Sequence, residues 1–287
     1  MNAQLIFLIA SYITSGFVST QLTIPSTQQL SVRLVLAGLL ALPIIKWRNL
    51  ITIPPRSALL CILGGISGYG IGAWAFIHAI SLGGYGTAVF ITSLPWLGLL
   101  DLFVRGSKVC RREKFALAVS SFGCVVFFLP ALRESSSLPS TFQVVLWSCI
   151  SSVAVSFAQY ARRFHAPEIS SSVVADGVIL TAFLLGVMSW EELPTSLGFG
   201  DLTWLVVGAL CYLASNRLSS TVFQNLSPAK VSVALSSEPA IALALSLIFL
   251  PYATHHEEFL GASILVIATV ISHRRIRSHQ TDSSSGL

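Results

Sequence analysis

Apolar residues along the chain gather into ten stretches of about 20, separated by short polar turns. A helix of about 20 apolar residues crosses the hydrocarbon core of a bilayer. Lipid offers no partner for free backbone N–H and C=O groups, and the stretches are rich in Leu, Ala, Gly and Ser, so they predict α-helices rather than barrel strands. The predicted spans are 4–22, 30–46, 57–80, 85–103, 113–131, 142–163, 172–190, 201–222, 229–250 and 257–274.

Composition strengthens this interpretation. Hydrophobic residues make up 54% of the 287 residues and charged residues only 10%, and the mean hydropathy is +0.78. Soluble domains carry roughly 25% charged residues. The composition therefore excludes a water-soluble fold, and the short turns leave no room for a sizeable soluble domain.

The net charge of +5 comes from residues in the short turns, a topological pattern that does not indicate a nucleic-acid partner. Cytoplasmic loops accumulate Lys and Arg. With the N-terminus inside, the outer loops hold only Arg133, while Arg33 and Arg217 fall within spans. The other fourteen of the 17 lie inside: Lys46, Arg48, Arg56, Arg105, Lys108, Arg111, Arg112, Lys114, Arg162, Arg163, Lys230, Arg274, Arg275 and Arg277. We therefore expect a multi-pass protein of the plasma membrane, in a bacterium the inner membrane, with both termini cytoplasmic.

The N-terminus contains no Lys or Arg before the first span, so it lacks the charged region of a signal peptide. We expect the first helix to remain in the mature protein.

The chain also resembles itself. A shift of 144 residues aligns Leu82 with Leu226, Ser93 with Ser237, Pro95 with Pro239, Glu113 with Glu257 and Phe115 with Phe259. Each half then contains five spans, an odd number, so the second copy enters the membrane with the opposite orientation. Inverted repeats of this kind are common in secondary transporters, whose substrate site lies near the midplane between the halves. The expected units are a first repeat (1–134), a second repeat (135–274) and a basic, Ser-rich cytoplasmic tail (275–287).

Two passages resemble a known family. Residues 82–88, leading to Ser93-Leu94-Pro95, resemble the third-to-fourth helix passage of the EamA-type drug/metabolite transporters, and residues 225–230, leading to Glu238-Pro239, resemble the eighth-to-ninth passage. Residues 257–261 and the apolar run after them are similar to the closing helix. The resemblance implies ten helices with both termini cytoplasmic. It also implies a central cavity lined by the third, fourth, eighth and ninth helices, with the first and sixth.

Ionisable side chains within spans are costly and usually face a cavity or a partner. Glu238 is the deepest, and Pro239 beside it removes a backbone donor. Glu238 is a candidate cation or proton site, or alternatively a structural partner of Arg217. Arg217 itself could bind a substrate carboxylate or hold Glu238. Pro95 and Pro239 are candidate helix breaks for gating.

Three further charged residues suggest structural roles. Arg33 lies near the outer end of its span and can extend to the interface. Asp101 and Arg105 have the spacing of an i,i+4 pair. Asp176 lies near the inner surface opposite Arg162 and Arg163, and we expect it to act as a tether.

Neutral residues are the better candidates for specificity. Gly64, Gly68 and Gly72 recur every four residues and predict a close helix contact. The remaining candidates for the cavity wall are polar or aromatic residues of the expected lining helices: Tyr69, Trp74, His78, Trp96, Gln159, Tyr160 and Asn216. His78 could relay protons, although a lone His is more often an ordinary polar residue.

The sequence offers nothing for cofactor chemistry. It contains no Walker lysine, GxSxG serine or HExxH motif. The turn at 255–258 (His-His-Glu-Glu) lacks helical ligand spacing, so we expect no metal, and the five cysteines are interpreted as reduced packing residues. We expect no cofactor and no enzyme activity.

The sequence thus predicts an all-α integral membrane protein that transports a small polar metabolite by alternating access. The family resemblance implies that the substrate is an amino acid or a similar compound, such as S-adenosylmethionine. We expect a monomer or homodimer to move it, with a proton or a counter-substrate. A proton-coupled exporter of lipophilic cations that uses Glu238 is the alternative. An intramembrane enzyme or lipid-handling scaffold would need a cluster of reactive side chains that the sequence does not show.

Overall fold

The computed structural model is all-helical over the residues that it describes. These residues are 3–82, 85–105, 109–135, 141–164, 169–189, 197–249 and 255–273. Helices cover most of each predicted apolar stretch. Within the described ranges, four helical segments are long and apolar enough to cross a membrane: Pro55–Ser81, Gly86–Arg105, Thr141–Ala161 and Ser171–Met188.

The first half of the chain contains one long, composite rod and one broken helix. Its helices are α1 (Ala3–Thr20), α2 (Ser26–Ala41), the short α3 (Trp47–Ile51), α4 (Pro55–Gly65), the π-helical η1 (Ile66–Gly72), α5 (Ala73–Ser81), α6 (Tyr85–Ser93), α7 (Trp96–Arg105), α8 (Arg111–Phe127) and α9 (Leu129–Ser135). α4, η1 and α5 follow one another without interruption. The wider π turn falls where glycine is most frequent.

The second half has longer single helices. They are α10 (Thr141–Ala161), α11 (Ser171–Met188), α12 (Phe199–Asn225), α13 (Pro228–Leu235), α14 (Glu238–Phe249) and α15 (His256–His273). The predicted join of the repeats lies partly outside the described residues, and the predicted tail lies wholly outside them.

Two apolar stretches are broken near their middles, each beside a proline. α6 ends at Ser93 and α7 begins after Pro95, and α13 ends at Leu235 before α14 begins at Glu238. A proline has no N–H to donate to the carbonyl four residues earlier, but it is tolerated in the first turn of a helix. The chain therefore restarts a helix at each proline instead of continuing the old one.

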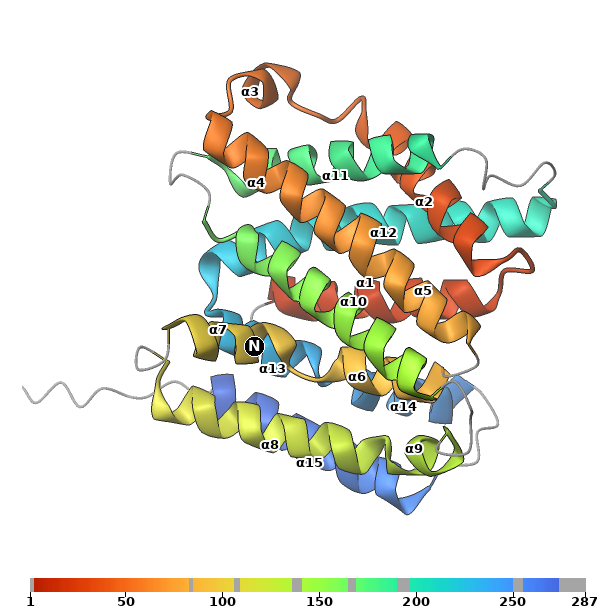
Figure 1. Ribbon diagram of the computed structural model, residues 1–287, viewed down its shortest axis with the longest axis vertical. Helices are drawn as coiled ribbons and strands as arrows, with labels where there is room; N and C mark the ends of the chain where they lie inside the picture. Colours follow the sequence, from red (N-terminus) through yellow and green to blue (C-terminus); the bar gives the residue numbers. More distant parts are fainter. Residues whose placement is uncertain are drawn as a thin grey trace, which may run out of the picture.

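The helices lie roughly side by side in the view of Figure 1. α8 pairs with α15 at one end of the bundle, and α2 packs against α11 toward the other. Between them, α1 packs on α12, α10 packs on the α4–η1–α5 rod, and α7 packs on α13.

Buried serines let these helices approach closely. Ser151 Oγ donates to the Gly72 carbonyl at 2.7 Å, and Ser67 Oγ donates to the Ala154 carbonyl at 2.7 Å. Both bonds join α10 to η1. Small residues and interhelical hydrogen bonds of this kind are typical of helix packing in lipid, where apolar burial gives little driving force.

Candidate functional site

A buried arginine forms the centre of a polar cluster inside the bundle. Arg162 follows α10 directly and is 5% exposed. Its Nη1 donates to the Asn216 carbonyl at 2.8 Å and to Ser220 Oγ at 2.9 Å. Its Nη2 donates to Asn216 Oδ1 at 2.7 Å and to the Tyr69 hydroxyl at 3.3 Å. The guanidinium therefore ties α10, η1 and α12 together.

The partners of Arg162 are themselves held in place. Asn216 is 1% exposed, and its Nδ2 donates to the Ala175 carbonyl of α11 at 2.8 Å. The Tyr69 hydroxyl donates to Asn216 Oδ1 at 3.2 Å, and the Tyr69 ring lies 4.6 Å from that of Tyr212. Four helical segments thus converge here. The π turn is the segment that presents Tyr69, and such turns occur often at functional sites.

Tyr12 links this cluster to the broken helix α13/α14. It lies on α1 and its hydroxyl is 3.2 Å from Ser219 Oγ of α12. The Tyr12 side chain also packs against an apolar core that includes Val231 and Ala234 of α13.

Glu238 begins α14 at the break. Its side chain is half-buried and forms no hydrogen bond or ion pair with any residue that the structure describes. The sequence-based alternative that Arg217 holds Glu238 is wrong. Arg217 Nη2 instead binds Asp176 Oδ1 at 2.8 Å, where the carboxylate is 2% exposed. The expected tether from Asp176 to Arg162 or Arg163 is replaced by this pair, because Arg162 is turned toward Asn216.

At the helix break between α6 and α7, a tryptophan side chain satisfies the carbonyl that lacks its usual backbone donor. Pro95 cannot donate to the Ile91 carbonyl, and the indole N–H of Trp96 donates to it at 2.6 Å. Ala240 occupies the position equivalent to Trp96 under the 144-residue shift, so the second break has no such cap from this position. The indole N–H of Trp96 thus forms a hydrogen bond within its own segment of the chain.

Trp74 and His78 belong to a separate aromatic group. Their rings stack at 5.3 Å, and Trp147 of α10 meets both edge-on. Trp74 is 48% exposed. Trp147 precedes Arg162 by fifteen residues, which is about 22 Å along a helix, so this group is remote from the arginine cluster.

Two other predicted residues lie on α10 beside the cluster. Tyr160 is buried in an apolar core with Leu97 and Phe223, and its ring lies 5.0 Å from that of Phe164. Gln159 is half-buried. Neither is hydrogen-bonded to Arg162.

The glycine stripe lies against α10. A Cβ added at Gly72 would lie 2.7 Å from Val155 Cγ2, and one at Gly68 would lie 3.0 Å from the Ala158 Cβ. At Gly64 the nearest atom, the Ala158 carbonyl oxygen, is 3.7 Å away. The contact thus tightens from Gly64 to Gly72.

A groove of about 490 Å³ runs between Ser67 and the face of α10 that carries Leu146, Val153 and Phe157. These three side chains are exposed, and no charged group lines the groove. It faces the surroundings of the bundle and does not include Arg162 or Glu238.

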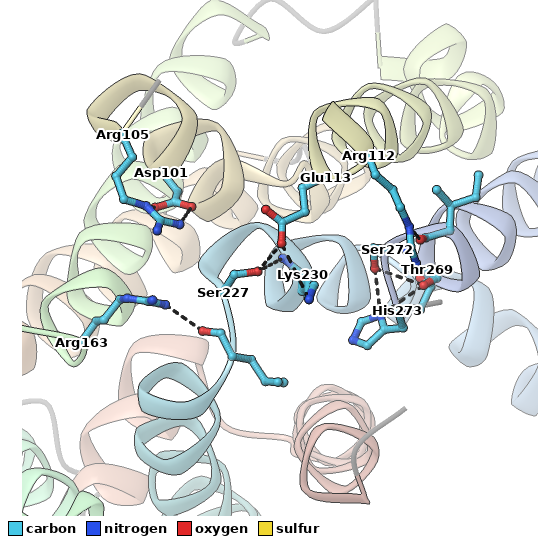
Figure 2. Close-up of polar contacts among 12 residues, drawn as sticks. Asp101, Arg105, Arg112, Glu113, Arg163, Ser227, Lys230, Thr269, Ser272 and His273 are labelled. Carbon is cyan, nitrogen blue, oxygen red and sulfur yellow. Dashed lines mark hydrogen bonds and ion pairs between the residues drawn. The ribbon is translucent and has the colours of Figure 1, made fainter. Parts of the chain in front are cut away.

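Polar contacts also gather at the end of the bundle shown in Figure 2. Ser227 Oγ donates to Glu113 Oε1 at 2.7 Å, and Lys230 Nζ lies 3.9 Å from the same oxygen. Arg163 Nη1 donates to the Leu226 carbonyl at 2.8 Å. These contacts join α8 and α10 to the turn between α12 and α13.

Other charged side chains of this region are paired locally. Asp101 accepts two bonds from Arg105, as the i,i+4 spacing predicts, and Arg112 donates to the Ile271 carbonyl. The expectation that Arg33 extends to the surface is wrong. Arg33 is 9% exposed, and its Nε lies 2.9 Å from where a Cβ at Gly208 would be.

No group of three or more potential metal ligands occurs among the described residues. Glu257 instead forms an ion pair with Arg133 at 3.0 Å, and Glu258 Oε2 accepts a bond from the His255 backbone. All five cysteines are free thiols.

Comparison with known proteins identifies the fold. No family profile and no curated protein matches the chain. Among solved structures, 29 chains match. One crystal structure superposes with a TM-score of 0.76 over 94% of this chain and 95% of its own, at 16% sequence identity. At this identity the likeness establishes a shared arrangement of helices over nearly the whole chain.

Sequence reasoning missed Arg162 as a site residue. It follows directly after an apolar span and precedes another arginine, the usual place of a cytoplasmic loop charge. The structure turns its side chain back into the bundle. Tyr12 was also missed, although a tyrosine within an apolar span was a usable signal because its hydroxyl needs a partner when buried.

Proposed function

We propose that the protein is a secondary transporter that moves an amino acid or a similar small metabolite across the plasma membrane by alternating access. The observation that carries the proposal is the pair of helix breaks, after Ser93 and before Glu238, near the middles of two apolar stretches. Discontinuous helices of this kind form the substrate and ion sites of transporters near the bilayer midplane.

The correspondence between the halves supports an inverted repeat. A shift of 144 residues carries the α4–η1–α5 rod onto α12, α2 nearly onto α11, and α8 nearly onto α15. Helices that correspond under the shift also make corresponding contacts. α1 packs on α12, and α10, the counterpart of α1, packs on the α4–η1–α5 rod, the counterpart of α12. α8 packs on its own counterpart, α15, and α2 packs on its own counterpart, α11. This correspondence supports our proposal of two EamA-type inverted repeats with ten spans in all.

The polar interior supports transport over a structural role. Arg162 is buried and Glu238 is half-buried, and neither has a partner of opposite charge among the described side chains. Charged groups inside a membrane bundle are costly and usually serve a substrate or ion pathway.

The test is counterflow into proteoliposomes that contain the purified full-length chain. The vesicles are loaded with a pool of amino acids, S-adenosylmethionine and nucleosides, and the uptake of each labelled compound is followed. We expect protein-dependent exchange of at least one amino acid or amino-acid-like compound, absent from protein-free vesicles. Exchange of lipophilic cations alone would favour the exporter function, and no exchange of any solute would contradict transport.

A further inference from the structure

The groove between η1 and α10, here called the α10 groove, is a cavity that opens on the surface of the bundle. Its volume is about 490 Å³. Ser67 of η1 forms one wall, and α10 contributes a row of side chains that includes Leu146, Ile150, Val153 and Phe157. Residues spaced three or four apart lie on one face of a helix. The groove therefore runs lengthwise along α10.

Small residues give the groove its depth. Ala154 lines it and is only 8% exposed, while Val153 and Phe157 beside it are 55% and 44% exposed. Among the described residues that line the groove, Ser67 carries the one hydroxyl group, and its Oγ donates to the Ala154 carbonyl at 2.7 Å. The lining therefore presents apolar surface, and its hydroxyl hydrogen is already used within the protein.

Both walls belong to segments that are long and apolar enough to cross a membrane, Pro55–Ser81 and Thr141–Ala161. In a bilayer the groove would thus open to hydrocarbon. From Leu146 to Phe157 it extends about 16 Å along the helix axis. A lipid acyl chain covers one leaflet, which is about 15 Å or half of the hydrocarbon core. The groove therefore matches a single acyl chain in length as well as in chemistry.

Aromatic rings lie beside one end of the groove. Trp147 directly follows Leu146, and its ring meets that of Trp74, which is 48% exposed. Tryptophan side chains are enriched where hydrocarbon meets the lipid headgroups. This end is therefore suited to the headgroup side of a lipid whose chain runs from Leu146 toward Phe157.

A second copy of the chain is a poorer occupant. Most homodimers have twofold symmetry, and a twofold contact centred on the groove would place the same hollow on both sides. Two hollows that face each other leave the lining atoms without contact partners. A flexible acyl chain can fill one groove along its whole length.

We propose that the α10 groove binds one acyl chain of a membrane lipid. The assignment rests on the membrane location in the proposed function, and on neither its substrate nor its mechanism. Ser67 lies two residues before Tyr69, which donates to Asn216 Oδ1 at 3.2 Å. A chain packed against Ser67 therefore supports the π turn that presents Tyr69 to the arginine cluster.

The experiment locates a bound lipid on the purified full-length chain by photo-crosslinking. The probe is a phosphatidylcholine with a diazirine in one acyl chain, added in dodecyl maltoside. Size-exclusion chromatography removes loosely held lipid before illumination, and mass spectrometry of peptides identifies the cross-linked segments. Val153→Trp fills the groove with a larger side chain. Val266→Trp on α15 is the matched control, because the two valines are 55% and 50% exposed.

We expect cross-links on the parent chain to concentrate on η1 and on α10 between Leu146 and Phe157, with few on the exposed face of α15. Val153→Trp should lose most of the α10 cross-links and fall to the level of α15. Val266→Trp should keep the parent distribution. If size-exclusion elution shows that Val153→Trp is not folded, Leu146→Trp fills the other end of the groove and should give the same loss.

The assignment is overturned if the parent cross-links equally on the exposed residues of α10 and α15, or if a folded, groove-filled variant keeps the α10 cross-links. Light scattering that shows a dimer which Val153→Trp converts to a monomer would assign the groove to a second copy, and would also overturn it. Counterflow on the same preparation separates the two proposals. Counterflow with evenly spread cross-links would remove only the lipid site, whereas concentrated cross-links without counterflow would support the lipid site and contradict transport.

Discussion

Two carboxylates on separate helices have opposite surroundings. Asp176 of α11 is 2% exposed and holds Arg217 at 2.8 Å, with a further weak bond from the Lys46 backbone at 3.4 Å. Glu238 of α14 has no described partner. The first carboxylate is therefore part of the scaffold that joins α11 to α12, and the second makes no such contact among the described residues. Substitutions at the two positions should separate these roles.

Glu238→Gln should leave the free energy of unfolding within about 0.5 kcal/mol of the parent, because the substitution removes no ion pair. Adding Arg217→Gln should lower the free energy of unfolding only by as much as Arg217→Gln does alone. Thermal unfolding of the parent, both single variants and the double variant in detergent measures this. A large loss in Glu238→Gln that Arg217→Gln restores would show that these two residues pair after all.

Asp176→Asn should destabilise the protein by about 1 to 3 kcal/mol, because it leaves the Arg217 guanidinium without its anion. Complete burial of both partners would raise the loss to roughly 3–5 kcal/mol, but the Arg217 side chain is 34% exposed and water compensates part of its charge. Combining Asp176→Asn with Arg217→Gln should recover much of the loss. Equal stability of Asp176→Asn and the parent would contradict a structural role for the pair.

At the scale of elements, the α4–η1–α5 rod depends on how closely it approaches α10. Hydrogen bonds from Ser151 and Ser67 join the two at 2.7 Å, and the glycine stripe leaves space for that approach. The space narrows along the rod, so the three glycines are not equivalent.

Gly72→Ala should lower stability by about 1 to 3 kcal/mol, because the new methyl group would lie 2.7 Å from Val155 Cγ2 and force the helices apart. Gly64→Ala is the matched control. It meets nothing closer than 3.7 Å, and alanine stabilises a helix by about 1 kcal/mol over glycine, so it should be neutral or stabilising. Melting temperatures of the two variants measure the difference, and identical values would contradict the tight contact at Gly72.

At the scale of the whole molecule, the contacts of Figure 2 hold the two halves of the chain together at one end. Glu113 and Arg112 of the first half contact Ser227 and Ile271 of the second. The loop-charge pattern predicts that this end faces the cytoplasm. Burial of Arg162 removes one of the fourteen predicted inner charges and leaves thirteen against one, so the expected orientation is unchanged.

Single cysteines at positions 108, 136 and 278 test this orientation. All three positions lie outside the described residues, and the five native cysteines would first be replaced. An impermeant maleimide should label position 136 in intact cells and positions 108 and 278 only after permeabilisation. Labelling of position 278 from outside would contradict both the orientation and the inverted repeat.

The sequence alone predicted where the helices lie, and it predicted a membrane around them. Apolar stretches of about 20 residues must satisfy their backbone bonds internally in lipid, so local composition is sufficient to place them. The prolines at 95 and 239 located the two breaks for an equally local reason, the missing N–H. The i,i+4 pair of Asp101 with Arg105 was also predictable, because helix geometry brings these side chains together.

Only the tertiary structure decided which charges meet. Arg162 and Arg163 are adjacent in the sequence and identical in type, yet one is buried against Asn216 and the other holds a carbonyl in the turn after α12. Arg217 binds Asp176 rather than Glu238 because the packing of α11 on α12 places that carboxylate within reach. Pairing between helices depends on their rotation and separation, which are set by side chains far away in the chain and leave no local pattern.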